Sequence, residues 1–342
     1  MAAAKSRLAS VGPTPRASGH SAEVPTPLLS GSYRRGTESV FRIVTEKHLQ
    51  AELLLDCRNF LGEGVRWNGA LQKLFWVDIE RAELWSLDPE DHATRTWTLP
   101  ERIGSFAFKG NGMMLVALES GLHEFDPETG EAKRLTEFEP DLPSTRMNDG
   151  VCDRQGRFIV GGLDEESLRP LSSVISYSAE GDVSPLISEV GCTNSLAFSS
   201  DGRKMYFADT SDRFIYRFDY DIENGRLGER VLFAALPEKG GRPDGSTIDA
   251  QDHLWNAEWG GNQVTCYDPD GAIVARVTLP VSNITCCTFG GSELSKLFIT
   301  SAQQGLTEEQ RVAQPHAGSL FVCDLAPGGL KNRGLPDVLY AG

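Results

Sequence analysis

Six short apolar runs, each of the kind that forms a buried β-strand, recur along the chain at nearly regular intervals. They begin at Leu74, Met114, Phe158, Met205, Leu254 and Leu297, so successive runs start 40, 44, 47, 49 and 43 residues apart. A repeat of this length that carries several strands is typical of a β-propeller, in which each repeat forms one blade around a central axis. The pattern therefore predicts an all-β, six-bladed propeller.

Each repeat also has the same internal order. A segment with a polar start leads into a turn, the apolar run follows, and a further strand ends the unit. These further strands are predicted over 83–88, 121–126, 174–179, 214–219, 263–268 and 319–324. The turns between them, such as NG, GNG and SSDG, are typical hairpin connections. A β-sandwich is the alternative, but it does not explain the regular step, and no GH…WD signature of a WD40 array is present.

The first part of the chain lacks this periodicity. Residues 1–45 are rich in Ala, Ser, Pro and Arg, which predicts a disordered N-terminal extension, with organelle targeting as a minor alternative. The propeller is expected over residues 46–342, with a first strand around Ala51–Asp56.

The amino-acid composition of the chain excludes several classes of function. The net charge of −15 argues against binding to nucleic acid or to an anionic membrane. No apolar run approaches the ~18 residues that a membrane span needs. The seven cysteines show no CxxC or Cys/His zinc spacing, and several lie in apolar strands, so we interpret them as reduced core residues of a cytoplasmic protein. No GxSxG elbow, P-loop or GxGxxG motif appears.

The residue that opens each innermost strand forms a second pattern. These positions are Glu63, Gly104, Asn148, Asn194, Asp244 and Asn283, and five of the six are carboxylates or amides. Because a propeller gathers the starts of its innermost strands at one end of the channel, these side chains are expected to meet there. Glu63, Asn194 and Asp244 offer the hard oxygen ligands that a divalent cation prefers. Taken singly, Asn or Asp before Gly is more often turn chemistry, and only the recurrence favours a site.

Two further positions are candidates for contact with a polar ligand. Arg146 lies two residues before Asn148 and therefore on the same side of a strand, where its planar fork could bind a ligand or form a surface ion pair. Glu165 and Glu166 lie in the longest loop within a repeat, which predicts either a lid or a solvated acidic loop. None of the histidines has a metal-ligand spacing.

Several motifs, taken in order, resemble one known family. GEGVRW, RMNDG, TNSLAFSSDG, RPDGSTID and CCTFGG are similar to those of the sugar lactonases that include gluconolactonase and regucalcin, also called senescence marker protein. The likeness extends from about Leu54 to Gly342. It implies a six-bladed propeller with one divalent metal in the central channel, in agreement with the number of repeats.

The resemblance also implies residue roles. Glu63, Asn194 and Asp244 would bind the metal, Asp244 would be the catalytic carboxylate, and Arg146, Asn148 and Glu166 would contact substrate. Val65 follows the GEG motif where many members have Pro, a difference that affects only a backbone angle. The implied activity is metal-dependent hydrolysis of an aldono-1,4- or 1,5-lactone, such as glucono-, xylono- or arabinono-lactone, to the open aldonic acid. The cation could be Ca, Zn, Mg, Mn or Fe(II).

Other functions remain open from sequence. The same ligands would serve a calcium-binding, regucalcin-like regulatory protein without turnover. A non-catalytic scaffold that binds peptides would instead place apolar or basic residues at the channel mouth. Hydrolysis of organophosphates or other esters is a possible side activity. The expected partner is a small sugar lactone, with no nucleic acid or membrane.

Overall fold

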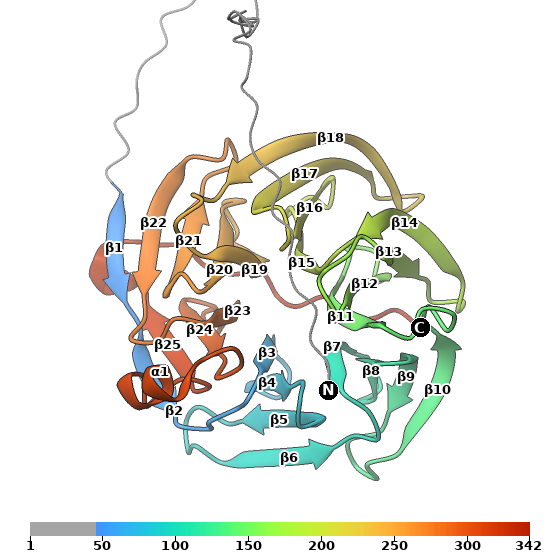
Figure 1. Cartoon of the computed structure of the whole chain (residues 1–342), viewed down its shortest axis with the longest axis horizontal. Helices are drawn as coiled ribbons and strands as arrows, with labels where there is room; N and C mark the ends of the chain where they lie inside the picture. Colours follow the sequence, from blue (N-terminus) through green and yellow to red (C-terminus); the bar gives the residue numbers. More distant parts are fainter. Residues whose placement is uncertain (1–45) are drawn as a thin grey trace, which may run out of the picture. The chain divides into compact units, whose positions relative to one another are not determined.

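Six antiparallel sheets follow one another along the chain and surround a central channel (Figure 1). The structure, a computed structural model, describes residues 46–342, and the extension predicted over 1–45 lies outside the described residues. The predicted six-bladed propeller is confirmed.

The strands take equivalent places in each blade. The innermost strands are β3 (Gly62–Asn68), β7 (Ile103–Phe108), β11 (Thr145–Cys152), β15 (Thr193–Phe198), β19 (Arg242–Ile248) and β23 (Ile284–Gly290). The second strands, which contain the predicted apolar runs, are β4 (Lys73–Asp78), β8 (Met114–Leu118), β12 (Phe158–Asp164), β16 (Lys204–Asp209), β20 (Leu254–Trp259) and β24 (Lys296–Ser301). The third strands are β5 (Glu83–Leu87), β9 (Gly121–Phe125), β13 (Ser172–Tyr177), β17 (Phe214–Asp221), β21 (Gln263–Tyr267) and β25 (Leu320–Asp324).

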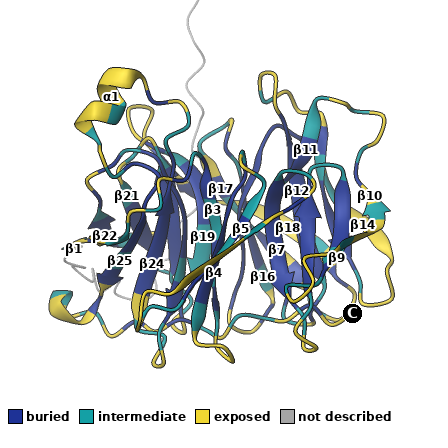
Figure 2. Cartoon of the chain, turned by 90° about the horizontal axis from the view of Figure 1, so that it is seen from below, coloured by how far each residue is buried: buried dark blue, intermediate teal, exposed yellow. Residues whose placement is uncertain are grey.

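A fourth, outermost strand completes each blade, and in blades 1 to 5 this strand was not predicted. Five of these strands directly follow the third strand of their blade: β6 (Thr94–Thr98), β10 (Ala132–Glu137), β14 (Val183–Val190), β18 (Arg226–Ala235) and β22 (Ile273–Thr278). β6, β10, β14 and β18 are largely exposed, whereas the inner strands are buried (Figure 2). β6, β10 and β14 face solvent and carry no continuous apolar run that would reveal them, whereas β18 ends in the apolar run VLFAA, which was not recognised as a strand.

The two ends of the propeller domain meet in blade 6. Strand β2 (Glu52–Leu55) pairs antiparallel with β25, so an early strand completes the blade that the late strands begin. This strand corresponds to the one predicted around Ala51–Asp56. The unpredicted β1 (Lys47–Gln50) precedes it and adds a parallel fifth strand to the outer edge of blade 5, against β22. The chain is therefore fastened to two neighbouring blades before β3 begins.

Apolar side chains fill the space between neighbouring blades. Phe75 of blade 1 meets Phe108 of blade 2 edge to face, with ring centroids 5.1 Å apart. All seven cysteines are free, and six of them are buried, as predicted for core thiols. Within residues 46–342 the one α-helix, α1 (Glu308–Ala313), is short, and no helix there is long and apolar enough to cross a membrane.

The C-terminal segment, residues 332–341, crosses the end of the channel opposite to the starts of the innermost strands. Gly334 pairs with Asp249 of blade 5, and Tyr340 pairs with Lys109 at the end of β7. The segment appears in Figure 1 as a red trace behind the innermost strands. A cavity of about 80 Å³ separates it from them.

One ion pair joins this segment to blade 1. The Arg66 guanidinium lies 3.0 Å from the Asp337 carboxylate, and their side chains are only 14% and 20% exposed. Both residues line the cavity. The segment is thus bound to the channel wall by charge as well as by backbone pairing.

We expect Asp337→Asn to lower the free energy of unfolding by about 3 kcal/mol, because it removes the carboxylate that pairs directly with the largely buried Arg66 charge. Glu293→Gln is the matched control: its partner Arg333 lies on the same segment, but the two side chains are 66% and 58% exposed. That change should cost less than about 0.5 kcal/mol. Urea unfolding of both variants measures the difference, and equal effects would show that the Arg66 pair does not fasten the segment.

Candidate functional site

Every innermost strand is interrupted by the same irregularity near its start. In blade 1, Glu63 pairs with Val77 and Arg66 pairs with Phe75, so the inner strand advances three residues while its neighbour advances two. The other innermost strands also gain one residue, within 103–105, 147–150, 194–197, 243–246 and 284–287. A β-bulge of this kind redirects the side chains around it. Of the six positions predicted to meet, all but Asn283 lie within a bulge.

Glu63 and Asp244 are brought into direct contact from blades 1 and 5. Their carboxyl groups hydrogen-bond to each other. Asp244 is 5% exposed, while Glu63 is partly exposed. Two carboxyl groups this close cannot both ionise without strong repulsion, so the pair holds a shared proton when no cation is near.

The pKa values of this pair reflect that confinement. Burial, and then the charge of Asp149, raise the pKa of Glu63 to about 8. Burial and the neighbouring Glu63 carboxylate raise the pKa of Asp244 well above its usual range. Asp149 is a third carboxyl group of the cluster; its own pKa is raised by burial, and it accepts a hydrogen bond from the Leu196 backbone N–H at 3.0 Å. The sequence reasoning did not single out this residue.

Asn194 lies beside the segment that carries Asp244 and is itself 5% exposed. Its Nδ2 donates to Thr210 Oγ1 at 2.7 Å, and that hydroxyl donates to the Pro243 carbonyl oxygen at 2.9 Å. The neighbouring Ser195 hydroxyl donates to the backbone oxygen of Asp244 at 2.7 Å. Because its nitrogen is engaged by Thr210, the amide presents Oδ1, for which the described residues provide no hydrogen-bond donor.

This donor set fits a divalent cation. It combines two adjacent carboxyl groups with an amide oxygen whose orientation is fixed through its nitrogen, and hard cations prefer such oxygen ligands. Within residues 46–342 no group of three or more His, Cys, Asp or Glu side chains has a metal-binding arrangement, so a site here depends on the Asn194 amide. Asn283 is not available in the same way, because its Oδ1 accepts a hydrogen bond from the Ser282 hydroxyl at 3.4 Å.

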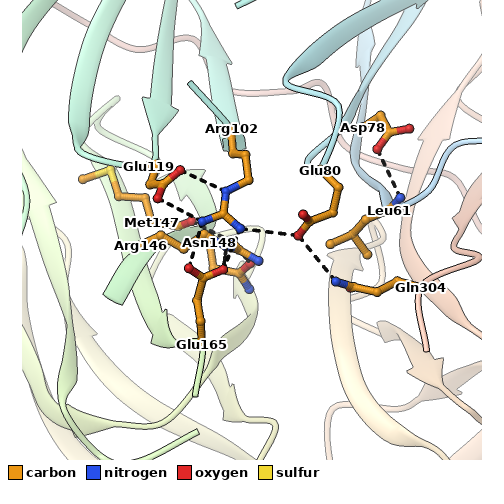
Figure 3. A network of polar contacts seen from close by, with 10 residues as sticks. All are labelled: Leu61, Asp78, Glu80, Arg102, Glu119, Arg146, Met147, Asn148, Glu165 and Gln304. Carbon is orange, nitrogen blue, oxygen red and sulfur yellow. Dashed lines mark hydrogen bonds and ion pairs between the residues drawn. The ribbon is translucent and has the colours of Figure 1, made fainter. Parts of the chain in front are cut away.

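Arg146 and Asn148 lie together at the mouth of the channel, as their spacing predicts (Figure 3). Arg146 Nη1 donates to Asn148 Oδ1 at 3.0 Å, and its Nε donates to Glu165 at 3.2 Å. Asn148 Nδ2 donates to the Thr193 carbonyl oxygen at 2.9 Å, next to Asn194. Arg146 is only 5% exposed, which excludes the alternative of a surface ion pair.

The two acidic residues of the long loop point in different directions. Glu165 faces Arg146, whereas Glu166 pairs with Arg169 at 2.7 Å and its side chain is 66% exposed. Asp164 organises the loop by accepting hydrogen bonds from the Arg169 guanidinium and from the Ser144 hydroxyl. In this conformation Glu165 is the acid nearer to the candidate substrate contacts.

Comparison with known proteins decides the family. Residues 61–303 match the family model described as SMP-30/Gluconolactonase/LRE-like region. The chain belongs to this family. L-arabinolactonase of Azospirillum brasilense is 39% identical over 285 residues, which cover 82% of this chain and 94% of that protein. Regucalcin of Xenopus laevis is 29% identical over 82% of this chain and 95% of its own.

A solved structure agrees with this assignment. The calcium-binding protein regucalcin of Agrobacterium tumefaciens superposes with a TM-score of 0.82 at 30% identity, covering 87% of this chain and 99% of that one. The resemblance drawn from the motifs is therefore confirmed, together with the propeller it implied.

This SMP-30/gluconolactonase-family propeller also contains mouth residues that the sequence reasoning missed, namely Glu80, Arg102 and Glu119, which lie around the predicted candidate Glu165. Glu80, Glu119 and Glu165 each follow the second strand of a blade by one or two residues, and Arg102 contacts all three. The signal that could have revealed them is their recurrence after β4, β8 and β12. It was overlooked because only the starts of innermost strands were compared.

In the absence of metal, the protein is expected to lose stability as the pH rises. The Glu63 pKa of about 8 in the folded chain exceeds the value of about 4.3 in an unfolded one. Protonation therefore stabilises the fold fully below about pH 4, and this contribution is lost as the pH rises towards 8. Glu63→Gln keeps a neutral group there and should be more stable than the wild type at high pH. Thermal unfolding with chelator, from about pH 5 to about pH 9, tests this; parallel curves for the two proteins would contradict it.

Proposed function

We propose that this protein hydrolyses a sugar acid lactone to the open aldonic acid, with a divalent cation held by Glu63, Asn194 and Asp244. The supporting observation is the contact between two carboxyl groups beside a free amide oxygen, below a mouth of hydrogen-bonding side chains. The relatives named as lactonases support the reaction class, and the similarity to an L-arabinolactonase favours a pentono-1,4-lactone among the candidate substrates.

The carboxyl and amide oxygens of Glu63, Asn194 and Asp244 are the reason for proposing a divalent cation. When bound, a divalent cation supplies Lewis-acid polarisation of an ester carbonyl and lowers the pKa of water. The oxygen ligands suit Ca, Mg or Mn, and Zn or Fe(II) would also bind them. Thr210 binds the amide nitrogen of Asn194, so the amide oxygen of Asn194 points away from Thr210.

Asp244 is the proposed proton carrier. Its carboxylate accepts a proton from the water whose oxygen attacks the carbonyl carbon of the lactone, and it returns that proton to the ring oxygen when the carbon–oxygen bond breaks. A carboxyl group whose pKa is raised by burial is better suited to return a proton than an exposed one. This exchange needs no covalent enzyme intermediate.

Arg146, Asn148 and Glu166 are the proposed contacts for the lactone hydroxyls. Arg146 and Asn148 are already fixed to each other by a hydrogen bond, so they present a preset surface to the substrate. Glu166 contacts a hydroxyl only if its exposed pair with Arg169 opens, and exposed pairs of this kind cost little to break.

Asp244→Asn is expected to lower kcat for lactone opening by about 10²- to 10⁴-fold, because the proton carrier is lost. Asp270→Asn, an exposed change in the turn between β21 and β22, is the control and should leave kcat unchanged. A pH-indicator assay with arabinono-, xylono- and glucono-lactone, with and without chelator, measures the rates.

The same assay separates the lactonase from a calcium-binding regulator. The solved relative titled a calcium-binding protein makes that second function worth testing. Calcium binding by the wild type without opening of any lactone would support the regulator and contradict the lactonase. Full activity of Asp244→Asn would contradict the role of Asp244.

A further inference from the structure

A second ring of side chains lies above the proposed cation site, at the exits of the second strands. Glu80, Glu119 and Glu165 belong to it in blades 1, 2 and 3, and Gln304 belongs to it in blade 6. Gln304 Nε2 donates to Glu80 at 3.4 Å. Figure 3 shows the Arg102 side chain between the three acids, directed towards all of them.

Arg102 comes from the one blade that gives no side chain to the inner ring. It directly precedes β7, where the inner position is Gly104. A Cβ at Gly104 would lie 2.6 Å from the carbonyl oxygens of Met147 and Asn148, so the strand that carries the substrate contacts packs where a side chain would be. Blade 2 therefore contributes Arg102 to the second ring and no side chain to the inner ring.

The Arg102 guanidinium uses all of its nitrogens within the ring. Nε and Nη2 donate to the two oxygens of Glu119 at 2.9 Å each. Nη1 and Nη2 donate to the two oxygens of Glu165 at 2.6 and 2.8 Å. Nη1 also lies 3.6 Å from Glu80. A guanidinium has five N–H donors in a fixed fork, so this arrangement leaves little of it for a substrate.

Glu165, in contrast, can still accept a further hydrogen bond. Its Oε1 accepts from both Arg102 and Arg146, whereas Oε2 accepts only from Arg102 among the described residues. The Arg102 hydrogen bonds are the main cause that lowers the pKa of Glu165, which keeps the carboxylate ionised. An ionised carboxylate fixed by two guanidinium groups is a rigid acceptor for a hydroxyl.

We infer that Arg102 is a positioning residue for substrate recognition: it fixes Glu165, and Glu165 in turn holds Arg146 and accepts a hydrogen bond from a lactone hydroxyl. The inference rests on the proposed lactonase function and deepens it. It assigns to Glu165 a hydroxyl contact in the conformation described, in addition to the contact proposed for Glu166. Arg102 acts through Glu165 and does not touch the substrate.

A double-mutant cycle tests this chain of contacts. Arg102→Met and Glu165→Gln should each raise KM about tenfold and change kcat less than about threefold, because they disturb binding and leave the proton carrier intact. If Arg102 acts through Glu165, the double variant should raise KM no more than about twofold beyond the larger single effect. Arg102→Lys should recover little, since an ammonium group cannot make two forked contacts.

Arg134→Met is the matched control. Arg134 also bridges acids close to blade 2, pairing with Glu101 and Glu137, but it lies on the outermost strand β10 and is 44% exposed. It should leave KM unchanged. Thermal midpoints of all variants show whether a KM effect accompanies a loss of stability.

The possible results distinguish a failure of this inference from a failure of the proposed lactonase function. A wild-type protein that opens no lactone contradicts the proposed function and the inference with it. Lactone opening by the wild type with an unchanged KM for Arg102→Met overturns the inference alone. A double variant whose KM rise is the product of the two single rises also overturns it, because Arg102 would then act independently of Glu165.

Discussion

The confinement of acidic groups at one end of a narrow channel is the constraint on which the rest of the structure depends. Glu63 and Asp244 come from blades 1 and 5, yet their carboxyl groups touch, and the charge of Asp149 acts on both. Left to themselves in water, such groups would separate. Burial and mutual repulsion raise the pKa values of both groups, and a bound cation would relieve that repulsion by charge.

Closure of the ring supplies the rigidity that this confinement requires. β2 completes blade 6 beside β25, and β1 adds to blade 5. The start of the domain therefore fastens the blade that carries Asp244 and the blade that lies between it and Glu63. At the other end of the channel, the C-terminal segment crosses from blade 5 to blade 2. The C-terminal segment thus covers one end of the channel, and the proposed substrate site lies at the other end.

Much of the fold could be predicted because its strongest signal is local. The second strands are buried on both faces, so their apolar runs repeat visibly, and turn residues mark the hairpins. The outermost strands could not be found in this way, since β6 and β10 face solvent. β1 was missed because its parallel pairing with β22 depends on a contact distant in sequence.

The candidate site was predicted in its inner ring, whereas of its outer ring only Glu165 was named from the sequence. The meeting of Glu63 with Asp244 follows from rotational symmetry and is found in the structure, whereas the six bulges that place these residues leave no mark in composition. The direction of Glu166 towards Arg169 could not be predicted, because it depends on how Asp164 folds the loop. Arg102 was missed because its partners come from three blades.

The central claim, that the propeller gathers distant oxygen ligands around one cation, is tested most directly by anomalous diffraction from crystals soaked in manganese. The account predicts one strong peak within about 2.0–2.6 Å of the Glu63 carboxylate, Asn194 Oδ1 and the Asp244 carboxylate. A peak elsewhere in the channel, or none in crystals of protein that binds manganese in solution, would contradict it.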